Sequence, residues 1–144
     1  IMYLDGDRSA AIRDDGFTLY KGSQVPKEVE TIKVDKEIVS TFYDDNIIGL
    51  VFKNGDKDKP YTMRGYSTDG SLKFEKKFNI PYTTIKASDG SILLYNSSQI
   101  SVMNSRGVEK YSGTVDGTIS DFIKTGWNRY LLVLDNGVDV IKLS

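Results

Sequence analysis

The side chains best suited by type and spacing to chemistry are carboxylates in a short loop. Asn54-Gly55-Asp56-Lys57-Asp58-Lys59 carries oxygen donors at alternate positions, which is how a calcium-binding loop begins. An EF-hand loop also needs Gly at its sixth position and Glu at its twelfth, where this chain has Lys59 and Gly65. The segment is therefore predicted to be a solvated hairpin loop. Asp5-Gly6-Asp7 and Asp44-Asp45-Asn46 are likewise predicted to be turns before they are metal ligands.

The only tryptophan provides the second candidate site. Gly126-Trp127-Asn128-Arg129 places Trp127 close to Arg129, and an exposed Trp beside an Arg is a good anchor for a ligand or a protein interface. We favour the other prediction, that Trp127 covers the end of a sheet. The nine Tyr are spread along the chain, which favours sheet packing over carbohydrate stacking. The candidate ligand-binding residues are Asp56, Asp58, Tyr61, Trp127 and Arg129.

Composition excludes several classes of site and partner. The chain has no Cys and no His, so disulfide frameworks, Cys/His zinc sites, thiol catalysis and histidine triads are excluded. Most Asp residues occupy turn positions that their backbone hydrogen bonding explains, so no catalytic residue, metal site or cofactor is expected. With 19 basic and 20 acidic residues, nucleic acid is not expected as a partner. No apolar run is long enough to cross a bilayer.

The elements that must position the candidate residues are predicted to be short strands. Val, Ile, Thr, Tyr, Phe and Trp, which favour strands, make up about a third of the chain. Seven Gly follow an Asp or Asn, and this pair favours type I′ hairpin turns, which need positive φ at both central residues. Gly70 and Gly90 are therefore expected at positive φ. The predicted strands are 2–4, 9–13, 17–20, 31–34, 38–43, 47–53, 61–67, 71–78, 83–87, 91–95, 100–104, 108–112, 118–124, 129–134 and 138–143. The stretch 25–39 could alternatively form an amphipathic helix that begins near Pro26.

A repeat of 37 residues organises these strands. Thr68-Asp69-Gly70-Ser71-Leu72 recurs 37 residues later as Ser105-Arg106-Gly107-Val108-Glu109. Second strands such as Ile92-Leu93-Leu94-Tyr95 are continuously apolar, and fourth strands are charged on one face. Four short strands per repeat of about 40 residues are typical of β-propeller blades. We predict an all-β protein of antiparallel four-stranded repeats, with three to four propeller-like blades in one domain. The expected units are 1–37, 38–80, 81–117 and 118–144, and 83–112 is expected to form one antiparallel meander.

A resemblance supports this architecture. Units that close on Asp-Gly or Arg-Gly before an apolar strand opens the next unit resemble the WD-repeat and quinoprotein-like propeller superfold. The WD dipeptide and the tryptophan docking motif of those families are missing. Residues 42–143 further resemble a family of uncharacterised, membrane-anchored propeller-like proteins of anaerobic Gram-positive bacteria, through 84–93 and 127–137. The resemblance implies an extracytoplasmic repeat region after an N-terminal transmembrane helix, and it implies no particular activity.

These observations predict a non-catalytic extracytoplasmic interaction or ligand-binding module, whose partner is an unidentified protein or glycan. Two alternatives are a hydrolase or lyase that acts on carbohydrate with carboxylates alone, and a structural spacer. The chain is expected to be part of a longer, membrane-anchored parent. Because Val138 and Val140 would line an uncovered blade face beside an open strand edge, the chain is expected to self-associate as a homodimer. The alternative is that residues 2–4 pair with the final strand and close the ring.

Overall fold

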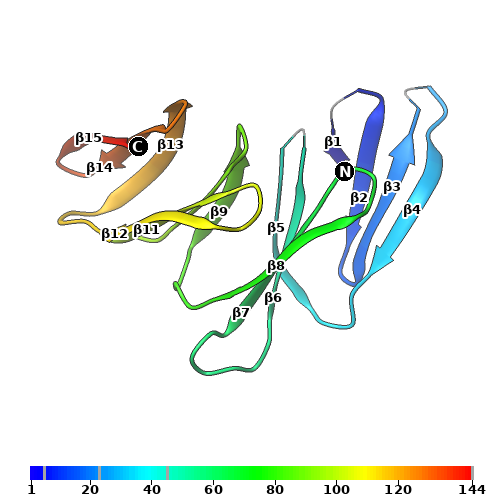
Figure 1. Ribbon diagram of the computed structural model, residues 1–144, viewed down its shortest axis with the longest axis horizontal. Coiled ribbons are helices and arrows are strands. Elements are labelled where there is room, and N and C mark those ends of the chain that lie inside the picture. The colour runs from blue at the N-terminus through cyan, green and yellow to red at the C-terminus, as the bar shows by residue number, and fades with distance from the viewer. Residues whose placement is uncertain (5, 23, 45, 144) are drawn as a thin grey trace. The chain divides into compact units, whose positions relative to one another are not determined.

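The computed structural model describes residues 1–4, 6–22, 24–44 and 46–143, and these contain fifteen β-strands and no helix (Figure 1). The strands form four antiparallel sheets, in each of which hydrogen-bonded neighbours follow one another along the chain. The described ranges hold no helix long and apolar enough to span a membrane. The first sheet contains β1 (Met2–Tyr3), β2 (Arg8–Arg13), β3 (Gly16–Lys21) and β4 (Lys27–Lys33), and the second contains β5 (Ile38–Tyr43), β6 (Ile48–Lys53), β7 (Tyr61–Tyr66) and β8 (Leu72–Phe78). The third contains β9 (Thr84–Ser88), β10 (Ser91–Tyr95), β11 (Gln99–Asn104) and β12 (Glu109–Thr114), and the last contains β13 (Ile119–Gly126), β14 (Arg129–Leu134) and β15 (Gly137–Lys142).

The predicted architecture of antiparallel four-stranded repeats is confirmed. Residues 83–112 form the predicted meander, which the structure extends through Thr114 as β9 to β12. The alternative helix over 25–39 is wrong, because Lys27–Lys33 is strand β4 and pairs with β3 from end to end, with one bulge at Val29. Val29, Thr31 and Ile32 suit a strand because branching at Cβ restricts their rotamers in a helix.

The turns differ in type from the prediction. Gly70 and Gly90 have the expected positive φ, at 95° and 79°. Among the described residues, however, only Asp89 combines a positive φ of 48° with a following Gly at positive φ, as a type I′ turn requires. The other described Asx-Gly turns therefore use the glycine alone in the left-handed region. Asp5 and Asp45, which belong to two predicted turns, lie outside the described residues.

The chain divides into two compact units, Ile1–Asn79 and Ile80–Ser144, and each contains two of the sheets. In the N-terminal unit the first and second sheets share one apolar core. Phe17 and Tyr66 meet edge to face in it, with ring centroids 5.1 Å apart. The Arg8 guanidinium donates a hydrogen bond of 3.0 Å to the Thr68 hydroxyl, which links the same two sheets. The core residues are Met2, Leu4, Ala10, Phe17, Leu19, Val34, Ile48, Leu50 and Tyr66.

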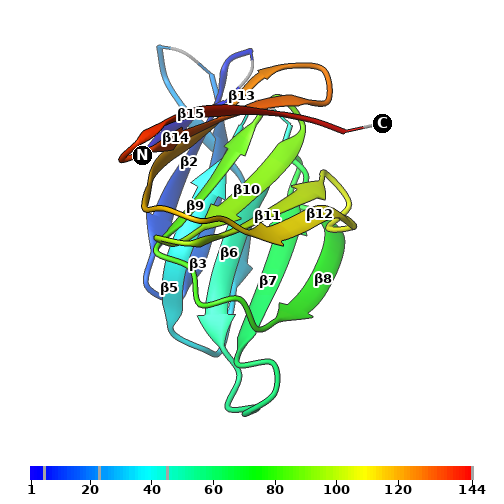
Figure 2. The same ribbon diagram turned by 90° about the vertical axis from the view of Figure 1, so that its left-hand side faces the viewer.

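The C-terminal unit has the same construction from the third and fourth sheets (Figure 2). Residues of β10, β11, β13 and β14 share its core, in which the rings of Phe122 and Tyr130 lie 5.7 Å apart. Every residue of β10 is buried, which agrees with the continuously apolar second strand expected of a blade. This core supports the hairpin of β13 and β14, which carries the only tryptophan.

Candidate functional site

The β13–β14 hairpin presents Trp127 to solvent. Its two-residue connection is Trp127-Asn128, and Asn128 adopts a positive φ of 53°, which Asn tolerates better than most residues. The Trp127 side chain is 86% exposed. The prediction that Trp127 covers the end of a sheet is therefore wrong, because its place at the hairpin tip directs the indole away from the core.

The base of this hairpin is fixed to the third sheet by polar contacts. The hydroxyls of Ser91 and Tyr130, both buried, lie 3.0 Å apart and share a hydrogen bond. The Lys124 ammonium donates to the Asp89 carbonyl oxygen at 2.7 Å. The backbone N–H of Leu143 donates to the Asn128 carbonyl at 2.7 Å, so the chain after β15 also holds the tip. Trp127 thus projects from a rigid support.

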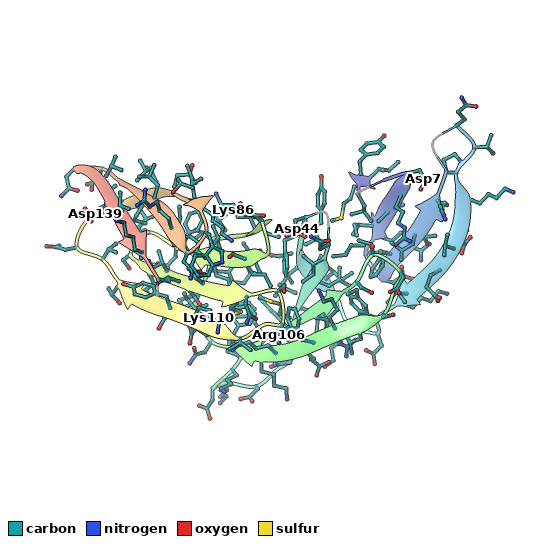
Figure 3. The ribbon with its side chains drawn as sticks, turned by 45° about the horizontal axis from the view of Figure 1, so that its top comes forward. Asp7, Asp44, Lys86, Arg106, Lys110 and Asp139 are labelled. Carbon is teal, nitrogen blue, oxygen red and sulfur yellow. The ribbon has the colours of Figure 1, made fainter. Side chains whose placement is uncertain are left out.

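An ionic network around Asp121 joins the same two sheets. The Asp121 carboxylate lies 3.2 Å from the Lys86 ammonium and accepts a hydrogen bond of 3.2 Å from the Tyr95 hydroxyl. Partial burial raises the pKa of Asp121, but hydrogen bonds from Lys86, the Phe122 backbone N–H and Tyr95 outweigh it, and the net pKa lies below its ordinary value. Figure 3 shows Lys86 on the C-terminal unit. Because these groups satisfy one another, we assign the network a structural role.

A hollow of about 300 Å³ lies beside Trp127 in the C-terminal unit. The β10–β11–β12 end of the third sheet forms one side of it, and the hairpin with the end of β15 forms the other. Apolar side chains alternate in its lining with hydroxyl, amide and ammonium groups, a composition typical of a specific binding pocket. The lining residues are Ser91, Val102, Met103, Asn104, Lys110, Trp127, Asn128, Tyr130 and Leu143.

Lys110 is the only charged residue in this lining. The pairing of β11 with β12 shifts between Val102 and Met103, so that Lys110 is the extra residue of a β-bulge. Bulges redirect side chains, and they are common beside functional sites. The neighbouring Glu109 accepts a hydrogen bond of 2.9 Å from the Ser101 hydroxyl and does not line the hollow. The bulge therefore gives the hollow a positive charge.

The structure does not bring the five predicted ligand-binding residues together. Asp56, Asp58 and Tyr61 belong to the N-terminal unit, whereas Trp127 and Arg129 belong to the C-terminal unit. The Asp56 carboxylate accepts hydrogen bonds from the backbone N–H groups of Asp58, at 2.9 Å, and Lys59, at 3.4 Å. It stabilises its own loop, as the prediction of a hairpin loop requires. Within the described ranges, no group of three or more Asp, Glu, His or Cys could hold a metal ion.

The remaining two predicted residues have different surroundings. Tyr61 stacks on Phe78, with ring centroids 5.2 Å apart, as a strand residue that packs along its sheet. Arg129 follows the hairpin tip but does not line the hollow. The next residue, Tyr130, does line it. Successive strand residues point to opposite faces, so Arg129 faces away from the Tyr130 side. Trp127 is thus the one predicted site residue that the structure places at the hollow.

Sequence reasoning missed Lys110, Asn104 and the pair of Ser91 and Tyr130. The 37-residue repeat offers a signal for one of them, because Lys110 is the repeat equivalent of Lys73. Lys73 is likewise the extra residue where the pairing of β7 with β8 shifts. Ser91 and Asn104 are direct cross-strand partners in the hairpin of β10 and β11. Tyr130 is brought to them by the packing of two sheets, which no local pattern encodes.

With this geometry described, the chain can be compared with known proteins. Residues 1–143 match a family described as a family of unknown function, DUF5711. The chain belongs to this family. No curated protein matches the sequence.

Solved structures similar to this member of the DUF5711 family are much larger β-propeller domains. The crystal structure of HIRA(644–1017) matches with a TM-score of 0.63 and 14% identity, over 96% of this chain and 45% of that one. The WD40 β-propeller domain of Doa1 matches with a TM-score of 0.61 and 13% identity, over 99% and 50%. BamB from Moraxella catarrhalis matches with a TM-score of 0.58 and 11% identity, over 96% and 46%. The chain has a β-propeller-like fold, and it spans about half the length of these structures.

Proposed function

We propose that this chain is a non-catalytic interaction module that binds a protein partner through Trp127 and the hollow beside it. The observation that carries the proposal is the exposure of the only Trp, at 86%, on a hairpin fixed by the buried hydrogen bond of Ser91 with Tyr130 and by that of Lys124 with Asp89. Trp is the residue type most enriched among interface residues whose truncation costs much binding energy. A large apolar side chain held in water on a rigid support gains apolar burial when a partner covers it.

The fold is compatible with this proposal, and because one fold hosts many functions, the proposal rests on the site. One similar structure, with a TM-score of 0.61 and 12% identity over 95% of this chain and 47% of that one, is BBS1N crystallised in complex with ARL6DN. A protein complex is therefore known for a domain of this architecture. The polar groups around the hollow could fix the orientation of a bound segment while Trp127 supplies contact area.

An extracytoplasmic location is the second part of the proposal, and it rests on the resemblance to membrane-anchored propeller-like proteins. The chain has no Cys, so a cysteine introduced at Tyr3, which is 77% exposed, would be its only thiol. We expect a membrane-impermeant thiol reagent to label Tyr3→Cys in intact cells of the native host. Labelling only after the cells are lysed would contradict the proposed location.

Peptide display tests the proposed binding site. A random peptide library is selected on the immobilised chain, and the selected peptides are then measured against Trp127→Ala and against Tyr3→Ala, a matched exposed aromatic of the other unit. We expect Trp127→Ala to weaken binding about tenfold or more and Tyr3→Ala to leave it unchanged. Both variants should unfold at the temperature of the parent, since both side chains are exposed. Peptides that bind independently of Trp127, or the failure to select any, would contradict the proposal.

A further inference from the structure

Three hydrogen-bond donors of the Trp127 hollow are unused. The Lys110 ammonium, the Asn104 side-chain N–H₂ and the Trp127 indole N–H have no hydrogen-bond or ion-pair partner among the described residues. The amide oxygen of Asn104, by contrast, accepts from the backbone N–H groups of Arg106 and Val108 at 2.9 and 3.0 Å. These two bonds fix the amide plane, so its N–H₂ group is the part of Asn104 that remains available to a ligand. The polar side of the hollow offers donors and a positive charge.

Lys110 has a second basic residue close to it in the sequence, Arg106. Arg106, in the turn before β12, stands where the preceding repeat has Asp69. Figure 3 shows Arg106 and Lys110 on the same part of the C-terminal unit. The positive charges of Lys110 and Arg106 would attract an anionic group to this part of the unit at long range.

The other side of the hollow is apolar. Val102, which belongs to the core shared with the fourth sheet, is buried in its lining, and Leu143 lines it from the end of the chain that follows β15. A volume of about 300 Å³ exceeds that of one large side chain, so an apolar group and a carboxylate can enter together. In an extended peptide, residues two positions apart point to the same side.

We infer that the hollow binds an extended acidic peptide segment, in which a large apolar residue lies two positions from an Asp or Glu. The inference rests on the proposed function and specifies the partner. The carboxylate accepts hydrogen bonds from Lys110 and Asn104, and the apolar side chain lies against Val102, Leu143 and the Trp127 ring. An acidic sugar would satisfy the donors equally well, but its hydroxyl-rich ring would cover the apolar floor without compensating hydrogen bonds.

Because Trp127 is the only Trp, its fluorescence reports directly on this site. The probes are the capped peptide acetyl-Gly-Leu-Ser-Asp-Gly-amide, its counterpart with Asn in place of Asp, and glucuronate. We expect the Asp peptide to shift the Trp127 emission to shorter wavelength in a saturable manner. The affinity for the Asn peptide should be lower by about tenfold or more, because a hydrogen bond to a charged group is lost. Added salt should lower the affinity for the Asp peptide more than the affinity for the Asn peptide.

Two lysine variants test whether Lys110 provides the positive charge that binds the peptide carboxylate. Lys110→Met should lower the affinity for the Asp peptide about tenfold and leave the affinity for the Asn peptide nearly unchanged. Lys73→Met removes the equivalent bulge lysine of the other unit and should change neither titration. Equal binding of the two peptides, or equal effects of the two variants, would overturn the inference. Saturable binding of glucuronate without binding of either peptide would also overturn it in favour of a sugar. Trp127-dependent display peptides that lack acidic residues would overturn this inference while the proposed function stands.

Discussion

Single glycines in left-handed turns carry part of the stability of this fold. At Gly90, with φ at 79°, an added Cβ would meet no atom within 4 Å, so Gly90→Ala tests backbone strain alone. We expect this variant to lower the free energy of unfolding by about 1 kcal/mol, because an L side chain is disfavoured in this conformation. Gly126→Ala is the matched control, since its Cβ is also unopposed and its φ is ordinary. Denaturant unfolding measures both, and identical values for the two variants would show that the turn tolerates Ala.

Asp69 makes one turn sensitive to acid. Hydrogen bonds from the Ser67 hydroxyl and from Ser71 lower the pKa of Asp69 to about 2. Because the unfolded value is about 3.9, the ionised carboxylate stabilises the fold above roughly pH 4, and this contribution is lost as the pH falls through the folded pKa. We expect Asp69→Asn to flatten the pH dependence of the unfolding free energy between these two values.

Asp58→Asn is the control for that series, because the Asp58 carboxylate accepts no hydrogen bond from any described residue. Urea denaturation at a series of pH values compares the variants with the parent. If Asp69→Asn and Asp58→Asn give the same slope as the parent, the hydrogen bonds of Asp69 do not contribute to stability.

At the scale of the element, the second sheet contains a row in which two glycines make room for two aromatic rings. Phe42, Gly49, Gly65 and Phe74 are successive cross-strand partners on β5, β6, β7 and β8. A Cβ on Gly49 would lie 2.0 Å from the Phe42 ring, and one on Gly65 would lie 2.2 Å from the Phe74 ring. The rings therefore cover the glycines and replace the side chains that these strands lack.

Gly65→Ala should be destabilising because the added methyl group and the Phe74 ring cannot occupy the same space. Overpacking of this kind costs about 1–3 kcal/mol in free energy of unfolding. In the double variant Gly65→Ala/Phe74→Leu, the clash is removed, so the two effects should not add. Thermal unfolding of the two single variants and the double variant measures the coupling. Strict additivity would mean that the ring moves aside freely.

At the scale of the whole molecule, the first and last sheets each leave an apolar face uncovered within their own unit. On β15, Val138 and Val140 are each 58% exposed. In the first sheet, the cross-strand partners Met2 and Ala10 enter the core. The neighbouring partners, Tyr3 and Ser9, therefore lie on the outer face of the sheet. That face carries a hollow of about 330 Å³ lined by Ile1, Ser9, Ala11, Tyr20 and Pro26.

Such faces favour association, so we expect the isolated chain to form a homodimer in dilute solution. The chain covers about half of the similar propellers, so two copies match the length of one. Val140→Lys should shift the sedimentation coefficient toward the monomer, whereas Val39→Lys, at a position 41% exposed on β5, should not. If the unmutated chain is a compact monomer that binds no apolar dye, this expectation is contradicted. That result would favour the alternative in which residues 2–4 pair with the final strand and close the ring.

The sequence by itself determined the strands, the turns and their grouping in fours. These features depend on neighbouring residues: Asx-Gly pairs reverse the chain, and alternating or continuous apolar residues show which strand faces are buried. The exact turn types were harder to predict, since only Asp89-Gly90 among the described pairs has both residues at positive φ.

Only the tertiary structure decided where the hollow beside Trp127 lies and which residues line it. Trp127 is exposed because the hairpin beneath it is anchored by Ser91 and Tyr130, which lie 39 positions apart in the chain. Lys110 reaches the hollow because the register of β12 shifts by one residue, and such a shift depends on the partner strand. A binding site that combines two packed sheets depends on long-range contacts, whereas the sequence pattern records only the local preferences from which each sheet is built.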